Sequence, residues 1–137
     1  MTEDDRRTNL RDEVARAEQA LRAAEALLGL GLHADSVSRS YYAVLHLVRA
    51  LLFSRGVEPR THSGAIHLFN AELVKSGLMP SSHNRILSGL QRSRELADYD
   101  AAVAFSAEDA GQYLDDAKTF SREALAFLRK AGWISSP

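Results

Sequence analysis

Apolar residues recur at intervals of three and four along most of the chain, which is the spacing of one face of an α-helix. The first row predicts a helix of about six turns and consists of Leu10, Val14, Ala17, Leu21, Ala24 and Leu28. Gly29 and Gly31 follow this row and end the helix. A second helix is predicted from Asp35 or Ser36, as the N-cap, to Arg55, with a core row of Val37, Tyr41, Leu45, Val48 and Leu52.

The rest of the chain follows the same spacing. A short third helix is predicted over residues 63–75, and a fourth carries Ile86, Leu87 and Leu90 as far as about Tyr99. Ser106 followed by Asp109 resembles a capping box, so a fifth helix should begin at Ala107. No segment alternates with period two long enough to indicate a strand. We therefore predict an all-α fold, a four-helix up-and-down bundle with an additional short helix.

The length of 137 residues fits one domain spanning 1–137, and we expect residues 1–7 and 135–137 to fray. The longest apolar run, residues 41–53, contains His46 and Arg49 and is too short to cross a bilayer. The N-terminal segment is charged and lacks the apolar stretch of a signal peptide. There is no cysteine. We expect a cytoplasmic protein that does not associate with membranes.

Two apparent motifs are decoys. "GLGLHA" at residues 29–34 matches a dinucleotide-binding fingerprint, but that fingerprint requires a preceding strand, and here a helix precedes it. His62 and His67 are five residues apart and lack a carboxylate at ligand spacing. We expect neither a metal nor another cofactor.

Charge is unevenly distributed, although the net charge is only −1. Residues 36–94 hold 8 basic and 2 acidic groups, a balance of +6, while residues 1–35 and 95–137 carry −3 and −4. A basic middle is compatible with an anion or an acidic partner, and equally with arginines that decorate a solvated face.

The second helix carries another row beside its core row. Its members are two cations, an imidazole and two aromatic rings at spacings of three and four, namely Arg39, Tyr42, His46, Arg49 and Phe53. Such a row fits an interface between copies of the chain, in which arginine stems cover aromatic rings, or a binding surface.

Arg94 continues the row of Leu87 and Leu90 on the fourth helix, so its side chain should point toward the seam between helices. Asp98 lies four residues further on and is predicted to pair with Arg94. The pair is either a structural ion pair or part of a phosphate site.

Four segments together carry a resemblance to a known family: "SRSYYAVLHLVRALLFSRG", "HSGAIHLF", "RELADY" and "SAEDAGQYLDDAKTF". They resemble the HEPN domain family, in particular its small single-domain bacterial and archaeal branch, over nearly the whole chain. The resemblance implies a compact helical bundle, usually homodimeric, whose members often cleave or bind RNA. Many members are encoded beside a minimal nucleotidyltransferase that neutralises them.

In active members of the family an arginine is followed on one helix, after four to six residues, by a histidine, and the pair cuts RNA without metal. The resemblance carries the arginine over to Arg94 or Arg92, but the histidine has no counterpart, because Tyr99 and Asp98 occupy its positions. His46 is the candidate substitute. Tyr99 is a candidate acceptor of AMP, since some of these toxins are modified on a tyrosine near that histidine.

We therefore expect a HEPN-type module, non-catalytic or weakly catalytic, that binds RNA, a nucleotide or a nucleotidyltransferase partner, as part of a toxin–antitoxin pair. The candidate catalytic residues are Arg94 and His46, and the candidate binding residues are Arg39, Tyr42, Arg49, Arg92, Asp98 and Tyr99. Two alternatives stay open: a metal-independent endoribonuclease toxin, and a homodimeric helical scaffold without an anion site.

Overall fold

The computed structural model describes residues 2–99 and 104–135, except for the side chains of Asn84 and Ala97. The described residues form helices and no strand, which confirms the all-α class. The elements are α1 (Glu3–Gly29), α2 (His33–Ser54), α3 (His62–Phe69), a π-helical turn η1 (Asn70–Val74), α4 (Ser81–Tyr99) and α5 (Ala107–Lys130).

The first helix begins earlier than its apolar row indicates. Residues 3–7, which we expected to fray, form its first turns because Thr2 and Asp5 build a capping box. Thr2 Oγ1 accepts a hydrogen bond from the Asp5 backbone N–H at 3.0 Å, and the Asp5 carboxylate accepts one from Thr2 N–H. The Arg6 guanidinium adds a tertiary tie by donating to the Phe53 carbonyl oxygen at the end of α2. This start therefore depends on both a local cap and a long-range contact.

The predicted N-cap of α2 is wrong. The helix begins at His33, and its N-cap, Leu32, makes no side-chain hydrogen bond. Ser36 is fully buried inside the first turns, where its hydroxyl donates to the Ala24 carbonyl oxygen of α1 at 2.7 Å. The hydroxyl therefore joins α1 to α2 instead of capping the helix.

α3 begins at His62, one residue before the predicted start, because Thr61 caps it by accepting a hydrogen bond from Gly64 N–H. After Phe69 the backbone widens into the π-helical turn η1, which carries the buried Leu73. The predicted start of α5 is confirmed: Ser106 is its N-cap and accepts from the Asp109 backbone N–H at 3.0 Å.

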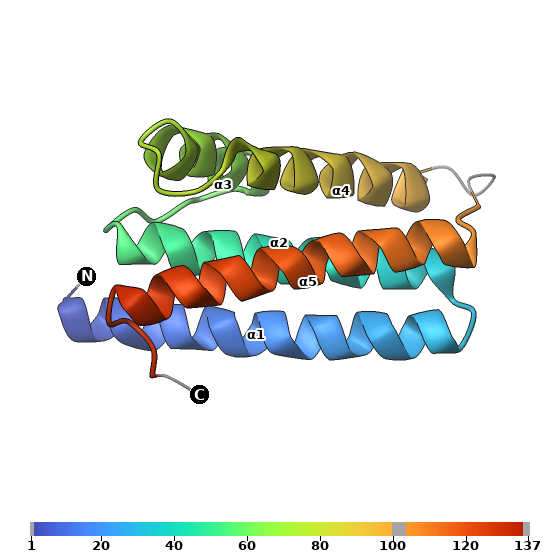
Figure 1. The fold of residues 1–137 in the computed structure, drawn as a ribbon, viewed down its shortest axis with the longest axis horizontal. Helices are drawn as coiled ribbons and strands as arrows, with labels where there is room; N and C mark the ends of the chain where they lie inside the picture. The colour runs from blue at the N-terminus through green and yellow to red at the C-terminus, as the bar shows by residue number, and fades with distance from the viewer. Residues whose placement is uncertain (1, 100–103, 136–137) are drawn as a thin grey trace.

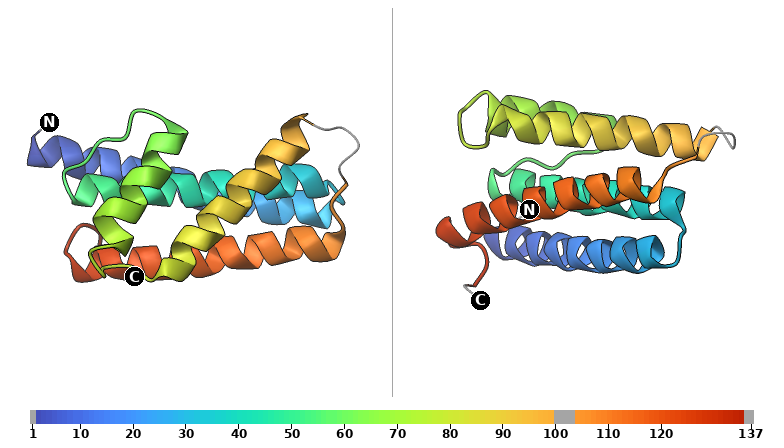
Figure 2. Two further views of the ribbon diagram at one scale, coloured as in Figure 1. Left: turned by 90° about the horizontal axis from the view of Figure 1, so that it is seen from above. Right: turned by 45° about the vertical axis from the view of Figure 1, so that its right-hand side comes forward.

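α2 is the central helix and contacts α1, α3, α4 and α5. Figure 1 shows α1, α2 and α5 running side by side along the molecule, with α3 and α4 above them. Seen from above, α4 crosses α2 obliquely (Figure 2, left). The arrangement is compatible with a four-helix bundle, and the oblique crossing brings one face of α4 over the middle of α2.

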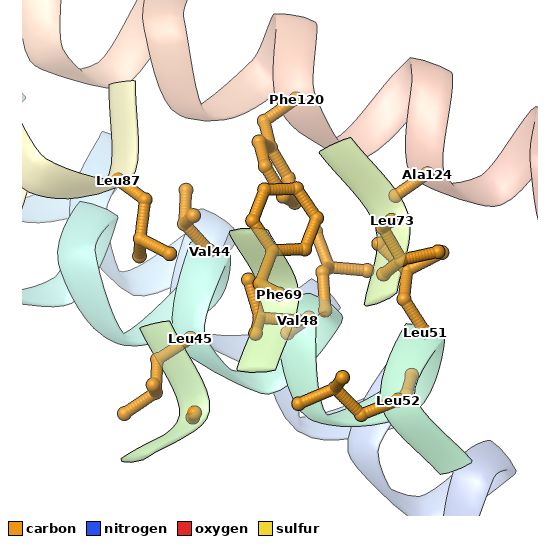
Figure 3. Packing of buried hydrophobic residues seen from close by; sticks show 14 of the residues in the cluster. Val44, Leu45, Val48, Leu51, Leu52, Phe69, Leu73, Leu87, Phe120 and Ala124 are labelled. Carbon is orange, nitrogen blue, oxygen red and sulfur yellow. The ribbon is translucent and has the colours of Figure 1, made fainter. Parts of the chain in front are cut away.

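The core lies where these layers meet. Every member of the predicted core row of α2, from Val37 to Leu52, is buried, as predicted. Phe69 and Phe120 pack with their rings tilted to each other and the ring centroids 5.7 Å apart, and they join the upper layer to α5 among the aliphatic side chains labelled in Figure 3. Burying each such side chain contributes about 1.5–3 kcal/mol, so this core fixes α2 relative to the helices around it.

Candidate functional site

The second row of α2 lies beside its buried face, toward α3 and α4. Arg39 is exposed, whereas Tyr42, His46 and Arg49 are half-buried. Phe53, at the end of the row, is only 4% exposed and belongs to the core. The row therefore divides into a polar part that reaches the surface and one apolar residue that does not.

Arg94 of α4 meets this row at Tyr42. Its Nη2 donates a hydrogen bond of 2.9 Å to the Tyr42 hydroxyl, and its Cζ lies 5.3 Å from the centre of that ring. The Arg39 Cζ lies 5.0 Å from the same ring. One tyrosine ring thus holds two guanidinium groups from different helices, through the attraction of a cation to the electron-rich ring face.

The predicted pairing of Arg94 with Asp98 is confirmed, with 3.1 Å between Arg94 Nε and Asp98 Oδ2. The Nε–H is not aligned for a hydrogen bond to that oxygen, and the two side chains are 23% and 42% exposed. The pair therefore lies at the surface of the seam, where solvent weakens its contribution to folding.

Glu13 of α1, which the sequence did not point to, holds the other end of the row. Its side chain is 8% exposed, and its carboxylate lies 2.6 Å from His46 Nδ1 and accepts a hydrogen bond from Arg49 Nε at 3.2 Å. Burial alone would raise the pKa of this carboxyl group, but the hydrogen bonds and charges of His46 and Arg49 outweigh burial and lower it. Glu13 is therefore ionised at neutral pH.

This contact fixes how the His46 ring can act. With Nδ1 facing the Glu13 carboxylate, a neutral ring carries its proton on Nδ1 and keeps the lone pair on Nε2. A carboxylate that orients an imidazole in this way is a common arrangement in proton-transfer sites. The only sequence signal for it was an acidic residue directly beside the apolar row of α1.

His62, at the start of α3, is the second residue that sequence reasoning missed as a member of this site. Its ring centroid lies 6.5 Å from that of Tyr41 and 6.1 Å from that of Tyr42, both in edge-to-face geometry. Loss of solvent around the ring, followed by the positive charges of Arg94, Arg49 and His46, lowers the pKa of His62. These charges act on His62 because α2, α3 and α4 converge there.

We call this set the cationic cluster: Arg39, Tyr42, His46, Arg49, His62 and Arg94. Of the other candidate residues, Asp98 contacts the cluster through Arg94, whereas Arg92 and Tyr99 lie apart from it. Arg92 is exposed and sits two positions from Arg94, about 200° around α4. Tyr99 is 86% exposed at the end of α4.

A pocket of about 220 Å³ opens beside the cluster, on the α1 side of the Glu13–Arg49 pair. Its lining is Asn9, Asp12, Glu13, Arg16, Arg49, Phe53 and Glu58. Three carboxylates and two guanidinium groups give this lining no excess of positive charge, so it does not suit an anion. The cationic cluster carries an excess of positive charge and therefore suits an anion better than this pocket does.

Among residues 2–99 and 104–135, no three histidine, aspartate or glutamate side chains gather closely enough to hold a metal ion. In the same residues, none of the helices combines the length and apolar content that crossing a bilayer requires.

Comparison with known proteins shows the family to which the chain belongs. The family model described as HEPN domain matches residues 10–127. The chain belongs to the HEPN domain family. Relatives cover most of its length: the UPF0332 protein glr0978 of Gloeobacter violaceus is 38% identical over 118 residues, which is 85% of this chain and 94% of that protein.

Two relatives from Methanocaldococcus jannaschii carry a functional name. "Putative toxin MJ0605" is 32% identical over 115 residues, covering 80% of this chain and 86% of that protein. "Putative toxin MJ0142" is 28% identical over 115 residues, covering 84% and 78%. The family model thus confirms the resemblance to HEPN domains that the sequence predicted. The word toxin appears in the names of these two relatives.

Proposed function

We propose that this HEPN protein binds a phosphate group of RNA or of a nucleotide in the cationic cluster. The observation that carries the proposal is the Arg94 guanidinium, which is held against Tyr42 beside a second guanidinium, that of Arg39. An arginine presents five N–H donors in a fixed plane, and Tyr42 takes one Nη2 donor. The remaining donors can bind two oxygens of one phosphate in a forked geometry.

Packing prepares the site for this role. The side chain of Arg94 is only 23% exposed and is confined by two tyrosine rings, because its Cζ also lies 5.5 Å from the Tyr41 ring centre. A confined guanidinium loses little conformational entropy on binding. Asp98 is its exposed counter-charge, and a phosphate with more negative oxygens would displace it from Arg94.

Fluorescence anisotropy with a labelled oligonucleotide tests the proposal. Arg94→Ala and Arg92→Ala remove the same charge from the same helix, so the pair separates a specific contact from general electrostatics. We expect Arg94→Ala to weaken binding by at least about tenfold, the equivalent of one charge-assisted hydrogen bond. Arg92→Ala should weaken it by about twofold or less at near-physiological salt. Equal losses in the two variants would remove the cluster as the binding site.

A second function, metal-independent RNA cleavage by a toxin, is favoured by the Glu13–His46 contact. A neutral His46 whose Nδ1 is held by Glu13 leaves Nε2 to take the proton of a 2′-hydroxyl, and Arg94 would stabilise the charge on the phosphorus centre. The 2′-oxygen would attack the phosphorus and expel the 5′-oxygen, which takes a proton from solvent, so the products would carry 2′,3′-cyclic phosphate and 5′-hydroxyl ends. RNA that stays intact with the wild-type protein in the presence of chelator rules this function out, and loss of cleavage in His46→Gln supports it.

The partners implied by the family are part of the proposal. We propose a homodimer, and a minimal nucleotidyltransferase as the antitoxin in a toxin–antitoxin pair. Leu96 and Tyr99 support a contact at this end of α4, because both side chains are exposed, at 49% and 86%. The molar mass of the purified protein, measured by light scattering, tests the homodimer. Co-purification with a co-expressed nucleotidyltransferase tests the second partner. A monomeric mass at micromolar concentration excludes the stable dimer.

A further inference from the structure

His62 belongs to the cationic cluster, but the phosphate contacts proposed above are those of Arg94 and Arg39 and do not involve it. It is the first residue of α3, and its side chain is exposed although its ring contacts two tyrosines of α2. The groups that act on it come from two helices. Arg94 lies on α4, while Tyr41, Tyr42, His46 and Arg49 lie on α2.

The positive charges around His62 are only partly balanced. Glu13 is bound to His46 and Arg49, and Asp98 is bound to Arg94 at the surface. In the absence of a ligand, loss of solvent around the ring opposes a further proton on the imidazole most strongly, and the surplus positive charge adds to this, so the pKa of His62 lies below its ordinary value. An anion placed in the cluster reverses this balance and favours the protonated ring.

The start of α3 also favours an anion at this place. Thr61 satisfies the Gly64 N–H, and the positive end of the helix dipole lies beside His62. The hydroxyl of Tyr41 is buried and has no hydrogen-bond partner among the described residues, while its ring contacts both His62 and Arg94. A buried hydroxyl without a partner is costly, so the inner wall of the site holds a polar group whose hydrogen-bonding capacity is not satisfied.

We infer that His62 is a phosphate-contacting residue of the cationic cluster and that it takes up one proton when a phosphate group binds. The inference rests on the proposed function, and it adds a residue from a third helix and a dependence on pH. The ligand class is a phosphate group with at least one full negative charge, either an internal phosphodiester or a terminal phosphate. No bond forms or breaks in this step, and the proton comes from solvent.

The sign of the pH effect follows from linkage. Binding raises the pKa of His62 from its lowered value, so the bound state holds more protons than the free state between the two pKa values. Affinity is therefore highest below the free-state pKa, falls as pH rises from the free-state to the bound-state pKa and is constant above the bound-state pKa. The limiting slope is one proton, or about tenfold in Kd per pH unit.

The experiment measures the Kd of a labelled oligouridine by anisotropy at several pH values between about 5 and 8. A 2′-O-methyl backbone prevents cleavage, and its phosphodiesters keep their charge throughout this range. A second oligonucleotide with one added terminal phosphate separates the two sources of the ligand. Terminal-phosphate recognition predicts tighter binding of the second probe at every pH, and diester recognition predicts equal binding.

Three variants assign the proton. His62→Asn should remove most of the slope, with affinity at neutral pH reduced by about threefold or less, because the imidazole is neutral there in the free protein. His67→Asn is the matched control, an exposed histidine on the same helix whose loss should leave the slope unchanged. His46→Gln tests the other histidine of the cluster. A slope that survives in His62→Asn but disappears in His46→Gln overturns the inference.

A direct readout is the titration of the histidine ring signals by NMR, with the His62 signal assigned from His62→Asn among the five histidines. The pKa of His62 should rise when the oligonucleotide is added, while that of His67 should not. An unchanged His62 titration with oligonucleotide bound refutes the inference and leaves the proposed function standing. No binding by the wild-type protein at any pH refutes the proposed function as well.

Discussion

Replacing Glu13 with glutamine is the most informative single change, because it should weaken the fold and strengthen anion binding at the same time. Glutamine keeps the shape of the side chain but removes the charge that faces His46 and Arg49. The Glu13 side chain is 8% exposed, while the side chains of His46 and Arg49 are 24% and 28% exposed. The loss is therefore smaller than for a fully buried ion pair.

The magnitude follows from the two charged contacts. Each hydrogen bond to a charged group contributes about 1.5–3 kcal/mol in a buried setting, and partial exposure of the partners reduces this. We expect Glu13→Gln to lower the free energy of unfolding by about 2–3 kcal/mol and the Tm by about 8–12 °C. Freed from the carboxylate, Arg49 and His46 should tighten oligonucleotide binding by about threefold to tenfold at low salt.

Urea denaturation and anisotropy, run on the same preparations, measure the two effects. Glu25→Gln is the matched control, because Glu25 lies on α1 in an exposed ion pair with Lys118, at 3.0 Å. It should cost at most about 0.5 kcal/mol and leave binding unchanged.

The pH dependence supplies the refuting result. The folded-state pKa of Glu13 is lowered, so its contribution to stability is complete above the unfolded value of 4.5 and is lost as pH falls through the folded value. The difference between wild type and Glu13→Gln should therefore be full near neutral pH and shrink toward zero in acid. A difference that stays constant down to the acid transition, or weaker anion binding by the variant, would show that Glu13 does not balance the cluster.

Three further predictions concern stability and can be measured by thermal or urea unfolding. Arg94→Ala should cost about 1–2 kcal/mol, because its ion pair with Asp98 is partly exposed and its hydrogen bond to Tyr42 is lost as well; a loss well above this would favour a purely structural pair. Ser106→Ala should cost about 1 kcal/mol by removing the N-cap of α5, and Ser106→Asp should restore it. Arg6→Ala should cost about 1–2 kcal/mol, because the Phe53 carbonyl at the end of α2 loses its donor, whereas Arg11→Ala on the same helix should be neutral.

The sequence by itself determined the helices, because a helix face repeats every three to four residues and its caps are local. The buried row of α2 and the Ser106 cap of α5 follow from spacing alone. So does the contact of Arg94 with Asp98, one turn apart. The N-cap prediction for α2 failed because the Ser36 hydroxyl has a tertiary partner, the Ala24 carbonyl oxygen of α1.

Only the tertiary structure decided the composition of the site. Glu13 meets His46 across 33 positions of sequence, and Arg94 meets Tyr42 across 52. Such contacts depend on where the packed helices cross, and the crossing is set by the shapes of many core side chains together. Local spacing carries no information on that crossing, so Glu13 and His62 could be found only once α1, α3 and α4 were placed against α2.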